Sequence, residues 1–415
     1  MGIDLLQHVP EGDKRNSAFF DEYRQKIIER RLSLGLDQLL GQLRALIVHV
    51  QTADGLPYLG ELALMTPYRL IGSYINASHR IFVLGSKAEF PRLIVMEPLS
   101  PSYEDDIKQL NMIYPLARRK PNARYVGEVL HTRDLAETVA LLEGCNIRFH
   151  YPGECENGFY TLDALRFSVP SDFTHNRLGY SALNLDDPDE WQLGQPFQLT
   201  TEQQHQLRQQ EELGESLGIA HLIEGVDHMA TRVLAGERED AILEFLTLSN
   251  YYFWGAYNIE EMNSSTNVTR HPQVSDDKCS PAKVFTANNT PSFVNSFENL
   301  PMPTEDFVRN FGRRMHHIAY EVTDGDHSNA QKNVDFVVEQ LQQQAIPFLA
   351  KVIGECTDQP DLKQIFSKHS EYSVLITEYV ERCHGFAGFF TRENVASLTE
   401  AAGRDERYDH GHVFD

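Results

Sequence analysis

Two stretches of the chain repeat one pattern of polar and apolar positions. Aligned on His228 and His317, GVDHMATRV (225–233) and RRMHHIAYEV (313–322) both read x-His-(Met/Ile)-Ala-x-x-Val. The two histidines are 317 − 228 = 89 residues apart. Each stretch is a short alternating run, which predicts a β-strand.

Alternate residues of a strand share a face, so each copy places a histidine beside a small alanine. The two polar faces are His228, Ala230 and Arg232 in the first copy, and His317, Ala319 and Glu321 in the second. The other face of the second copy is mostly apolar and suits a core: His316, Ile318, Tyr320 and Val322. A lone strand histidine is usually an ordinary buried or exposed residue. Two at matching repeat positions, each with space beside the ring, favour a ligand or metal site.

The same alternation continues on either side of these stretches. Strands are predicted at 46–50, 70–75, 80–86, 92–99, 124–132, 147–151, 159–169 and 179–185, and again at 225–234, 250–259, 281–288, 313–322, 364–369 and 372–383. Helices are predicted at 20–45, 134–144, 237–249 and 333–344. Asp134 can cap the second of these helices, with Glu137 three residues on and Gly144 at its end.

This order predicts an α+β protein of tandem βαβββ modules in two pseudo-repeated halves. We expect an N-terminal domain at 1–184, a polar Gln- and Glu-rich linker at 185–219, a C-terminal catalytic domain at 220–402 and a polar tail at 403–415. At 415 residues the chain is too long for one ordinary core, and with 41% hydrophobic residues it has ample material to bury.

The net charge and the lengths of the apolar runs limit the partners that we expect. A net charge of −23 argues against nucleic acid or an anionic membrane bound through a basic surface. No run approaches the roughly 18 apolar residues of a membrane helix, and the start has no signal-peptide core. The five scattered cysteines (Cys145, Cys155, Cys279, Cys356 and Cys383) fit a reducing compartment without a disulfide framework. We therefore expect a cytoplasmic protein, with a homo-oligomer left open.

Two imidazoles need a third ligand to hold a metal firmly. Two histidines and one carboxylate form the facial triad of Fe(II) oxygenases, but zinc also accepts His₂Glu, so the ligands alone leave the metal open. The last predicted strand offers Glu378 and Glu381, which lie on opposite faces. Periodicity does not choose between them.

Four segments, in order over about 220–402, resemble the 4-hydroxyphenylpyruvate dioxygenase family. QIFSKHSEYSVLITEYVERCHGFAGF resembles its closing segment, with a QIF run, a Glu-x-x-x-Arg strand and a Gly-Phe-rich turn. HHIAYEV and VDHMATRV resemble its two histidine strands, and KVFTANNTPSFVNSFENL its central segment. The family has the vicinal-oxygen-chelate fold of glyoxalases, bleomycin-resistance proteins and dioxygenases. The resemblance implies that fold here.

The resemblance also implies residue roles. His228, His317 and Glu378 match the iron ligands, since the Glu-x-x-x-Arg register selects Glu378. The residues implied to bind substrate are Gln364, Phe366, His316, Phe386, Phe390 and Asn394, the last three from a turn and C-terminal gate helix that also include Phe389. His316 stands where the family usually has glutamine, so the substrate could be another 2-oxo acid.

The implied activity is that of a non-haem Fe(II)-dependent dioxygenase. It would use O₂ to decarboxylate and hydroxylate a 2-oxo acid, either 4-hydroxyphenylpyruvate or a related aromatic or aliphatic acid. Two alternatives remain: another metal enzyme of this fold, such as an extradiol ring-cleaving dioxygenase, lyase or isomerase, and a non-catalytic module that binds a small molecule. Fold alone does not separate them, because function resides in the site.

Overall fold

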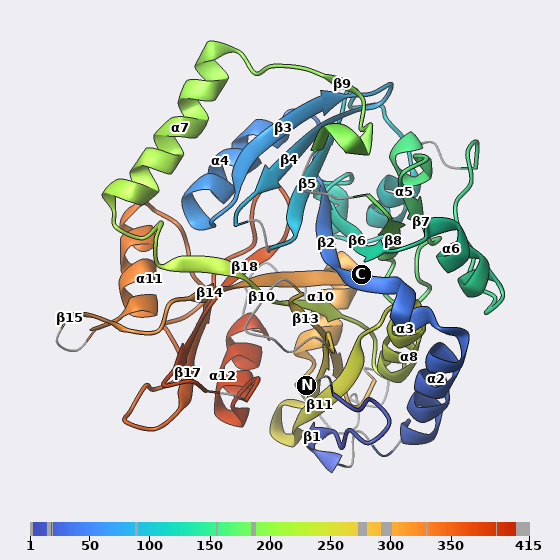
Figure 1. Ribbon diagram of the computed structural model, residues 1–415. Coiled ribbons are helices and arrows are strands. Elements are labelled where there is room, and N and C mark those ends of the chain that lie inside the picture. The colour runs from blue at the N-terminus through green and yellow to red at the C-terminus, as the bar shows by residue number, and fades with distance from the viewer. Residues whose placement is uncertain are drawn as a thin grey trace.

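The strands of the protein form two curled eight-stranded sheets, one above the other in Figure 1. The computed structural model describes residues 3–14, 18, 20–87, 90–154, 157–183, 188–272, 280–291, 301–328, 331–386 and 388–403. The N-terminal sheet consists, in spatial order, of β7 (Arg166–Phe167), β8 (Arg177–Ser181), β6 (Arg124–Thr132), β2 (Leu40–His49), β5 (Arg92–Pro98), β4 (His79–Gly85), β3 (Arg69–Ile75) and β9 (Gln195–Pro196).

The C-terminal sheet has the same layout. Its strands, in the corresponding spatial order, are β17 (Asp361–Phe366), β18 (Ile376–Cys383), β14 (Arg314–Val322), β10 (Ile223–Arg232), β13 (Ala282–Asn288), β12 (Ser264–Arg270), β11 (Tyr252–Ile259) and β1 (Glu11–Gly12). A small hairpin of β15 (Asp326–Ser328) and β16 (Gln331–Lys332) lies apart from both sheets. The predicted α+β class with two pseudo-repeated halves is confirmed.

Helices follow the strands in both halves. The α-helices are α2 (Asp21–Leu34), α3 (Leu36–Leu39), α4 (Gly55–Met65), α5 (Asp106–Met112), α6 (Leu135–Glu143), α7 (Thr201–Ser216), α8 (Arg238–Leu248), α10 (Pro303–Phe311), α11 (Asn333–Gln343) and α12 (Arg392–Gly403). Short 3₁₀ turns are η1 (Ala117–Arg119), η2 (Gly158–Thr161), η3 (Pro188–Trp191) and η4 (Glu260–Met262). The expected cap of α6 is present, since the Asp134 side chain accepts a hydrogen bond from the Glu137 amide.

Some of the predicted elements differ from the observed ones. The expected helix at 20–45 ends at Leu39, and β2 begins at Leu40. The expected strands at 147–151 and 159–169 are mostly irregular, with one isolated bridge between Phe149 and Ser168 beside the short β7. Their many aromatic residues have strand propensity, but here these side chains fill an interior, where burial outweighs local preference.

The two sheets share register shifts, which make their positions directly comparable. In each sheet the central antiparallel pair (β2 with β6, β10 with β14) shifts register at three points, at matching positions in the two sheets. The pairs on either side of the third shift are Ile47–Gly127 and Val48–Tyr125 in one sheet, and Ala230–His317 and Thr231–Met315 in the other. Each residue of the paired strands in the C-terminal sheet therefore has a counterpart at the matching register position of the N-terminal sheet.

Each sheet encloses its own interior, and their outer faces pack together. Leu46 and Val48 of β2 lie in one large core with Met229 and Ile318 of the other half. A buried ion pair between Lys283 and Glu128 also crosses this boundary. The inner face of the N-terminal sheet holds a separate apolar cluster, and the inner face of the C-terminal sheet holds the candidate site.

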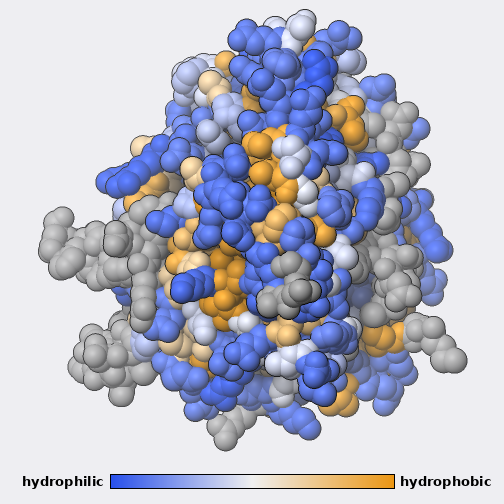
Figure 2. All heavy atoms as spheres, turned by 90° about the vertical axis from the view of Figure 1, so that its left-hand side faces the viewer, coloured by the Kyte–Doolittle hydropathy of each residue, from blue (hydrophilic) through white to orange (hydrophobic). Residues whose placement is uncertain are grey.

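Helix α7, of 16 residues, lies within the expected linker at 185–219. Thr200 caps it through a capping box with Gln203, which explains why a Gln-rich segment starts a regular helix there. Figure 2 views the face that carries α7 and α11, where a strip of apolar side chains interrupts a mostly hydrophilic surface. Within the described residues, no helix is long and apolar enough to cross a membrane.

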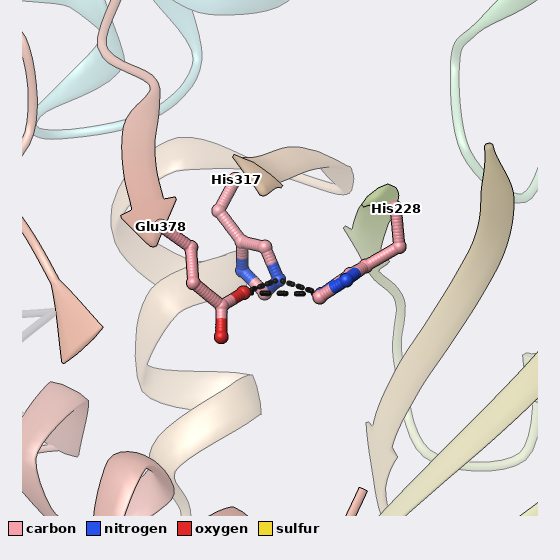
Figure 3. A group of neighbouring side chains, drawn as sticks. All are labelled: His228, His317 and Glu378. Atoms are coloured by element: carbon pink, nitrogen blue, oxygen red, sulfur yellow. Dashed lines mark hydrogen bonds and ion pairs between the residues drawn. The ribbon is translucent and has the colours of Figure 1, made fainter. Parts of the chain in front are cut away.

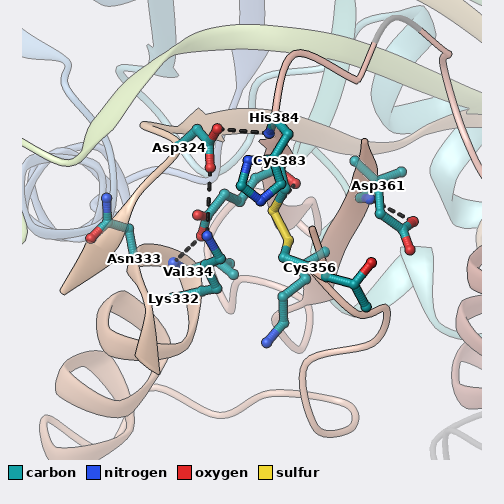
Figure 4. Close-up of a disulfide and its surroundings, with 12 residues drawn as sticks. Asp324, Lys332, Asn333, Val334, Cys356, Asp361, Cys383 and His384 are labelled. Atoms are coloured by element: carbon teal, nitrogen blue, oxygen red, sulfur yellow. Dashed lines mark hydrogen bonds and ion pairs between the residues drawn. A yellow bond between two sulfur atoms is a disulfide. The ribbon is translucent and has the colours of Figure 1, made fainter. Parts of the chain in front are cut away.

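The expectation of no disulfide is wrong at one pair. Cys356 is joined to Cys383 at the end of β18, beside Asp324 and Lys332 (Figure 4). Spacing could not reveal this bridge, because the two cysteines are 27 residues apart and meet only when β17 and β18 pair. Cys145 is free, and Cys155 and Cys279 lie outside the described residues.

Candidate functional site

Three side chains from three strands converge in the interior of the C-terminal sheet (Figure 3). The Nε2 atoms of His228 and His317 are 3.2 Å apart. Oε2 of Glu378 lies 3.0 Å from the first and 3.1 Å from the second. All three residues are buried. The structure thus brings together the residues that the sequence predicted as ligands.

The spacing of these atoms suits a metal ion held from one side. Nitrogen and oxygen ligands lie about 2.1 Å from a first-row ion, so two at right angles are about 3.0 Å apart, and two at the tetrahedral angle about 3.4 Å apart. The observed triangle of 3.0, 3.1 and 3.2 Å matches the right-angled arrangement better. Oε1 of Glu378 has no hydrogen-bond partner among the described residues, and Oε2 faces only the two histidines. The donor set therefore fits a cation with three adjacent protein ligands.

Strand register explains why the three meet. His228 pairs with Ala319, and Ala230 pairs with His317, so each histidine faces an alanine across β10 and β14. Ala319 also lies opposite Glu378 on the neighbouring β18. Both alanines are buried and leave room for the rings, as the sequence pattern indicated.

Glu381 serves a different purpose from Glu378. It points to the other side of β18, where its carboxylate accepts hydrogen bonds from the Gly325 and Val334 amides. Val334 is in the first turn of α11, so Glu381 satisfies an orphan amide at a helix start. This contact removes Glu381 from the site.

An ion pair behind the site fixes the orientation of His228. Nδ1 of His228 lies 2.7 Å from Oδ1 of Asp227, which leaves Nε2 to face Glu378. Arg382 holds both oxygens of Asp227 at 2.8 Å. Burial alone would raise the pKa of Asp227, but Arg382 and His228 bring it well below its ordinary value. Histidine ligands of metals commonly have such a carboxylate partner.

Proton affinities differ between the histidines. Burial lowers the pKa of His228, but the carboxylates of Glu378 and Asp227 outweigh it and raise the pKa to about 9. Burial lowers the pKa of His317, and it lowers that of His316 well below the usual range. The Nδ1 atoms of His316 and His317 are 2.8 Å apart, so one imidazole donates to the other. The carboxylates that favour a proton on His228 would also favour a metal cation there.

A cavity opens next to the triad. Its lining residues are Ala230, Arg232, Thr266, Val284, Thr286, His316, His317, Gln364, Phe366, Glu378, Phe390, Val395, Leu398 and Thr399. Gln364 is 1% exposed, and neither end of its amide has a hydrogen-bond partner among the described residues. Nε2 of His316 is also without a partner there. Buried polar atoms in this state indicate a site for a ligand or ordered water.

The residues predicted to bind substrate divide into two groups. Gln364, Phe366, His316 and Phe390 line the cavity. Phe386 and Asn394 do not. Phe386 packs at the edge of an apolar cluster with Phe389, and the Asn394 amide donates to the carbonyl of Leu362.

Sequence reasoning missed the threonines of the wall. Thr266 and Thr286 are on strands whose other residues are mixed in character, and no alternation marks them. Arg232 carried one usable signal, because it shares a strand face with His228 and Ala230. That face lines the cavity.

Comparisons with known proteins support the fold. No protein-family model and no curated protein sequence matches the chain. A triple variant of 4-hydroxymandelate synthase from Streptomyces coelicolor is 14% identical, with a TM-score of 0.57 over 88% of this chain and 99% of that one. A fusion of a xylose isomerase-like TIM barrel with 4-hydroxyphenylpyruvate dioxygenase is 12% identical, with a TM-score of 0.55 over 92% of this chain and 58% of that one. The chain therefore has the predicted vicinal-oxygen-chelate fold.

Proposed function

We propose that the protein is a non-haem Fe(II)-dependent dioxygenase that decarboxylates and hydroxylates a 2-oxo acid. The observation that carries this proposal is the triangle of His228, His317 and Glu378, the last two of which line a cavity. Two histidines and one carboxylate on one side of an ion are the donor set of Fe(II) oxygenases. The activities named for the two structural neighbours agree with this class of chemistry.

The triad residues have separate tasks in this proposal. Nε2 of each histidine and one oxygen of Glu378 hold Fe(II), which supplies the O₂ and redox chemistry when bound. A cation held by these three residues would leave room for a 2-oxo carboxylate and O₂. In the balanced reaction, one oxygen atom of O₂ enters the new carboxylate, the other becomes the hydroxyl, and C1 leaves as CO₂.

Residues around the triad orient the reactants and exclude water. Asp227, held by Arg382, accepts a hydrogen bond from Nδ1 of His228. This contact orients the ring so that Nε2 faces the site. Gln364 offers an amide to a polar group of the substrate, and the rings of Phe366 and Phe390 border its carbon skeleton. Fixed geometry of this kind converts binding energy into proximity.

The test is anaerobic loading with Fe(II), followed by O₂ uptake and CO₂ release against a panel of 2-oxo acids. The panel contains 4-hydroxyphenylpyruvate, phenylpyruvate and branched aliphatic 2-oxo acids. We expect equal amounts of O₂ consumed and CO₂ released with at least one acid. O₂ uptake without CO₂ would indicate ring cleavage instead, and turnover without O₂ would indicate an isomerase or lyase.

A further inference from the structure

The cavity is polar at two ends and apolar between them. Along β10, His228 belongs to the triad, Ala230 comes next on the same face, and Arg232 follows. Four residues of strand separate the α-carbons of His228 and Arg232 by roughly 13 Å. A molecule that spans this wall meets the metal ligands first and a guanidinium last.

Neighbouring strands reinforce this division into levels. Val284 of β13 lies opposite Ala230, so the middle level is apolar on the β13 side, while His317 of the triad lies on its β14 side. Thr286 lies opposite Arg232, and Thr266 of β12 lies opposite Thr286. Arg232, Thr286 and Thr266 thus form a row of hydrogen-bonding side chains across three adjacent strands, and all three line the cavity.

The guanidinium of Arg232 is held in place from the side of α10. Its Nη1 donates to the carbonyl of Pro303 at 3.2 Å, and its Cζ lies 5.1 Å from the centre of the Phe307 ring. The residue is only 5% exposed. A fixed, buried guanidinium matches a carboxylate in shape and charge, and burial strengthens the attraction.

We propose that the natural substrate is a 2-oxo acid with a second carboxylate, and that Arg232, aided by Thr286 and Thr266, binds that carboxylate at the end of the cavity away from the triad. This inference rests on the proposed function, because the triad end must hold the 2-oxo group. Arg232 is then a specificity-determining residue, which selects the substrate by its far end.

The test compares pairs of acids that differ only at the far end. Protein loaded with Fe(II) under nitrogen is titrated calorimetrically, so that binding is measured without turnover. The pairs are 2-oxoglutarate with 2-oxopentanoate, 2-oxoadipate with 2-oxohexanoate, and 2-oxopimelate with 2-oxoheptanoate. We expect one dicarboxylate to bind about 10- to 100-fold more tightly than its methyl-ended partner, as for a hydrogen bond to a charged group.

Variants test whether Arg232 causes the preference for dicarboxylates. Arg232→Met keeps the stem and removes the charge, and it should remove the preference by weakening the dicarboxylate alone. Arg232→Lys should keep part of it. Arg392→Met, the same change at an exposed arginine of α12, should leave the preference intact. Thermal melting of each variant checks that it folds, and the comparison of acids in the unaltered protein needs no variant at all.

Two contrary results are distinguishable. Equal binding of both members of every pair would overturn this inference alone, and Arg232 would then serve only to fasten α10. Failure of every acid to bind the Fe(II)-loaded protein, with 4-hydroxyphenylpyruvate, phenylpyruvate and the branched 2-oxo acids also titrated, would overturn the proposed function and this inference with it.

Discussion

The three strand positions that hold the triad in the C-terminal sheet hold small residues in the N-terminal sheet. Counted through the matching registers, the counterparts of His228, His317 and Glu378 are Ala45, Gly127 and Gly179. The lining differs in the same way. Ala230, Thr266, Val284, Thr286, His316 and Gln364 correspond to Ile47, Ile81, Ile94, Met96, Val126 and Leu165.

Because of these differences, two sheets with the same strand layout enclose interiors of different composition. All six N-terminal counterparts belong to a buried apolar cluster that also includes Phe159, Tyr160, Phe167 and Trp191. Both interiors contain buried polar atoms without a partner among the described residues, such as Nε1 of Trp191 in the N-terminal half. In the C-terminal half such atoms belong to Gln364, His316 and Glu378, which line the cavity. The comparison shows that one half fills these positions with apolar side chains, whereas the other keeps polar groups around a cavity.

The largest expected effect comes from the triad. His317→Ala and Glu378→Ala should each reduce turnover to background, because two remaining ligands cannot hold the metal firmly. His131→Ala changes a strand histidine of the N-terminal half and should leave turnover unchanged. Steady-state O₂ uptake measures all three. Full activity in both triad variants would contradict the claim that the C-terminal half holds the metal site.

The N-terminal sheet should not tolerate a side chain at Gly127, the position that corresponds to His317. A Cβ on Gly127 would lie 2.0 Å from the carbonyl oxygen of Arg177 on the neighbouring strand. Gly127→Ala should therefore lower the free energy of unfolding by about 3 kcal/mol, through backbone displacement in a packed sheet. Gly158→Ala, with open space at its Cβ, is the control and should be near neutral. Urea unfolding measures both free energies. Equal stability of the two variants would contradict the close approach of β6 and β8 at Gly127.

The ion pair behind His228 has no equivalent role in the N-terminal half, where Ala45 takes that histidine's place. Asp227→Asn should weaken metal affinity about 10- to 100-fold, as changes behind a metal-binding histidine do. The cause is lost charge beside Nδ1 and a weaker hold by Arg382. Competition with a fluorescent chelator measures the affinity. Asp134→Asn should bind metal normally, because asparagine also caps a helix.

The smallest effect should appear when a cavity residue is replaced by its N-terminal counterpart. Gln364→Leu copies Leu165 and removes a buried amide without a partner. We expect the metal-free protein to gain about 1–2 kcal/mol of unfolding free energy while substrate affinity falls. Urea unfolding and calorimetry measure the two quantities on one sample. A loss of stability would mean that ordered water satisfies the amide.

Much of the fold was readable because alternation survives wherever one strand face is polar. The two histidine strands, α6, α8 and α11 all lie where the pattern predicted them. Helix α4 was missed because GLPYLGELALM is apolar on nearly every side and has no polar face to mark a period. Strand β12 was missed for the opposite reason: SSTNVTR is polar, and only pairing with β11 and β13 buries it.

From local pattern alone, the site could be predicted only as far as the repeat extends, and the family resemblance added Glu378 and four of the cavity residues. His228 and His317 stood out because they share a repeat position. Periodicity left Glu378 and Glu381 open, and the helix start that engages Glu381 is invisible before the fold is known. The level occupied by Thr266 and Thr286 depends on pairing between strands, which no local pattern encodes.

The central claim is that this chain carries one metal site, built by His228, His317 and Glu378, in one of two matching halves. Anaerobic equilibrium dialysis with Fe(II), on the unaltered chain and on Glu378→Ala, tests it most directly. We predict one tightly bound iron per chain, absent from the variant. Two irons per chain, none, or one that persists in Glu378→Ala would contradict the claim.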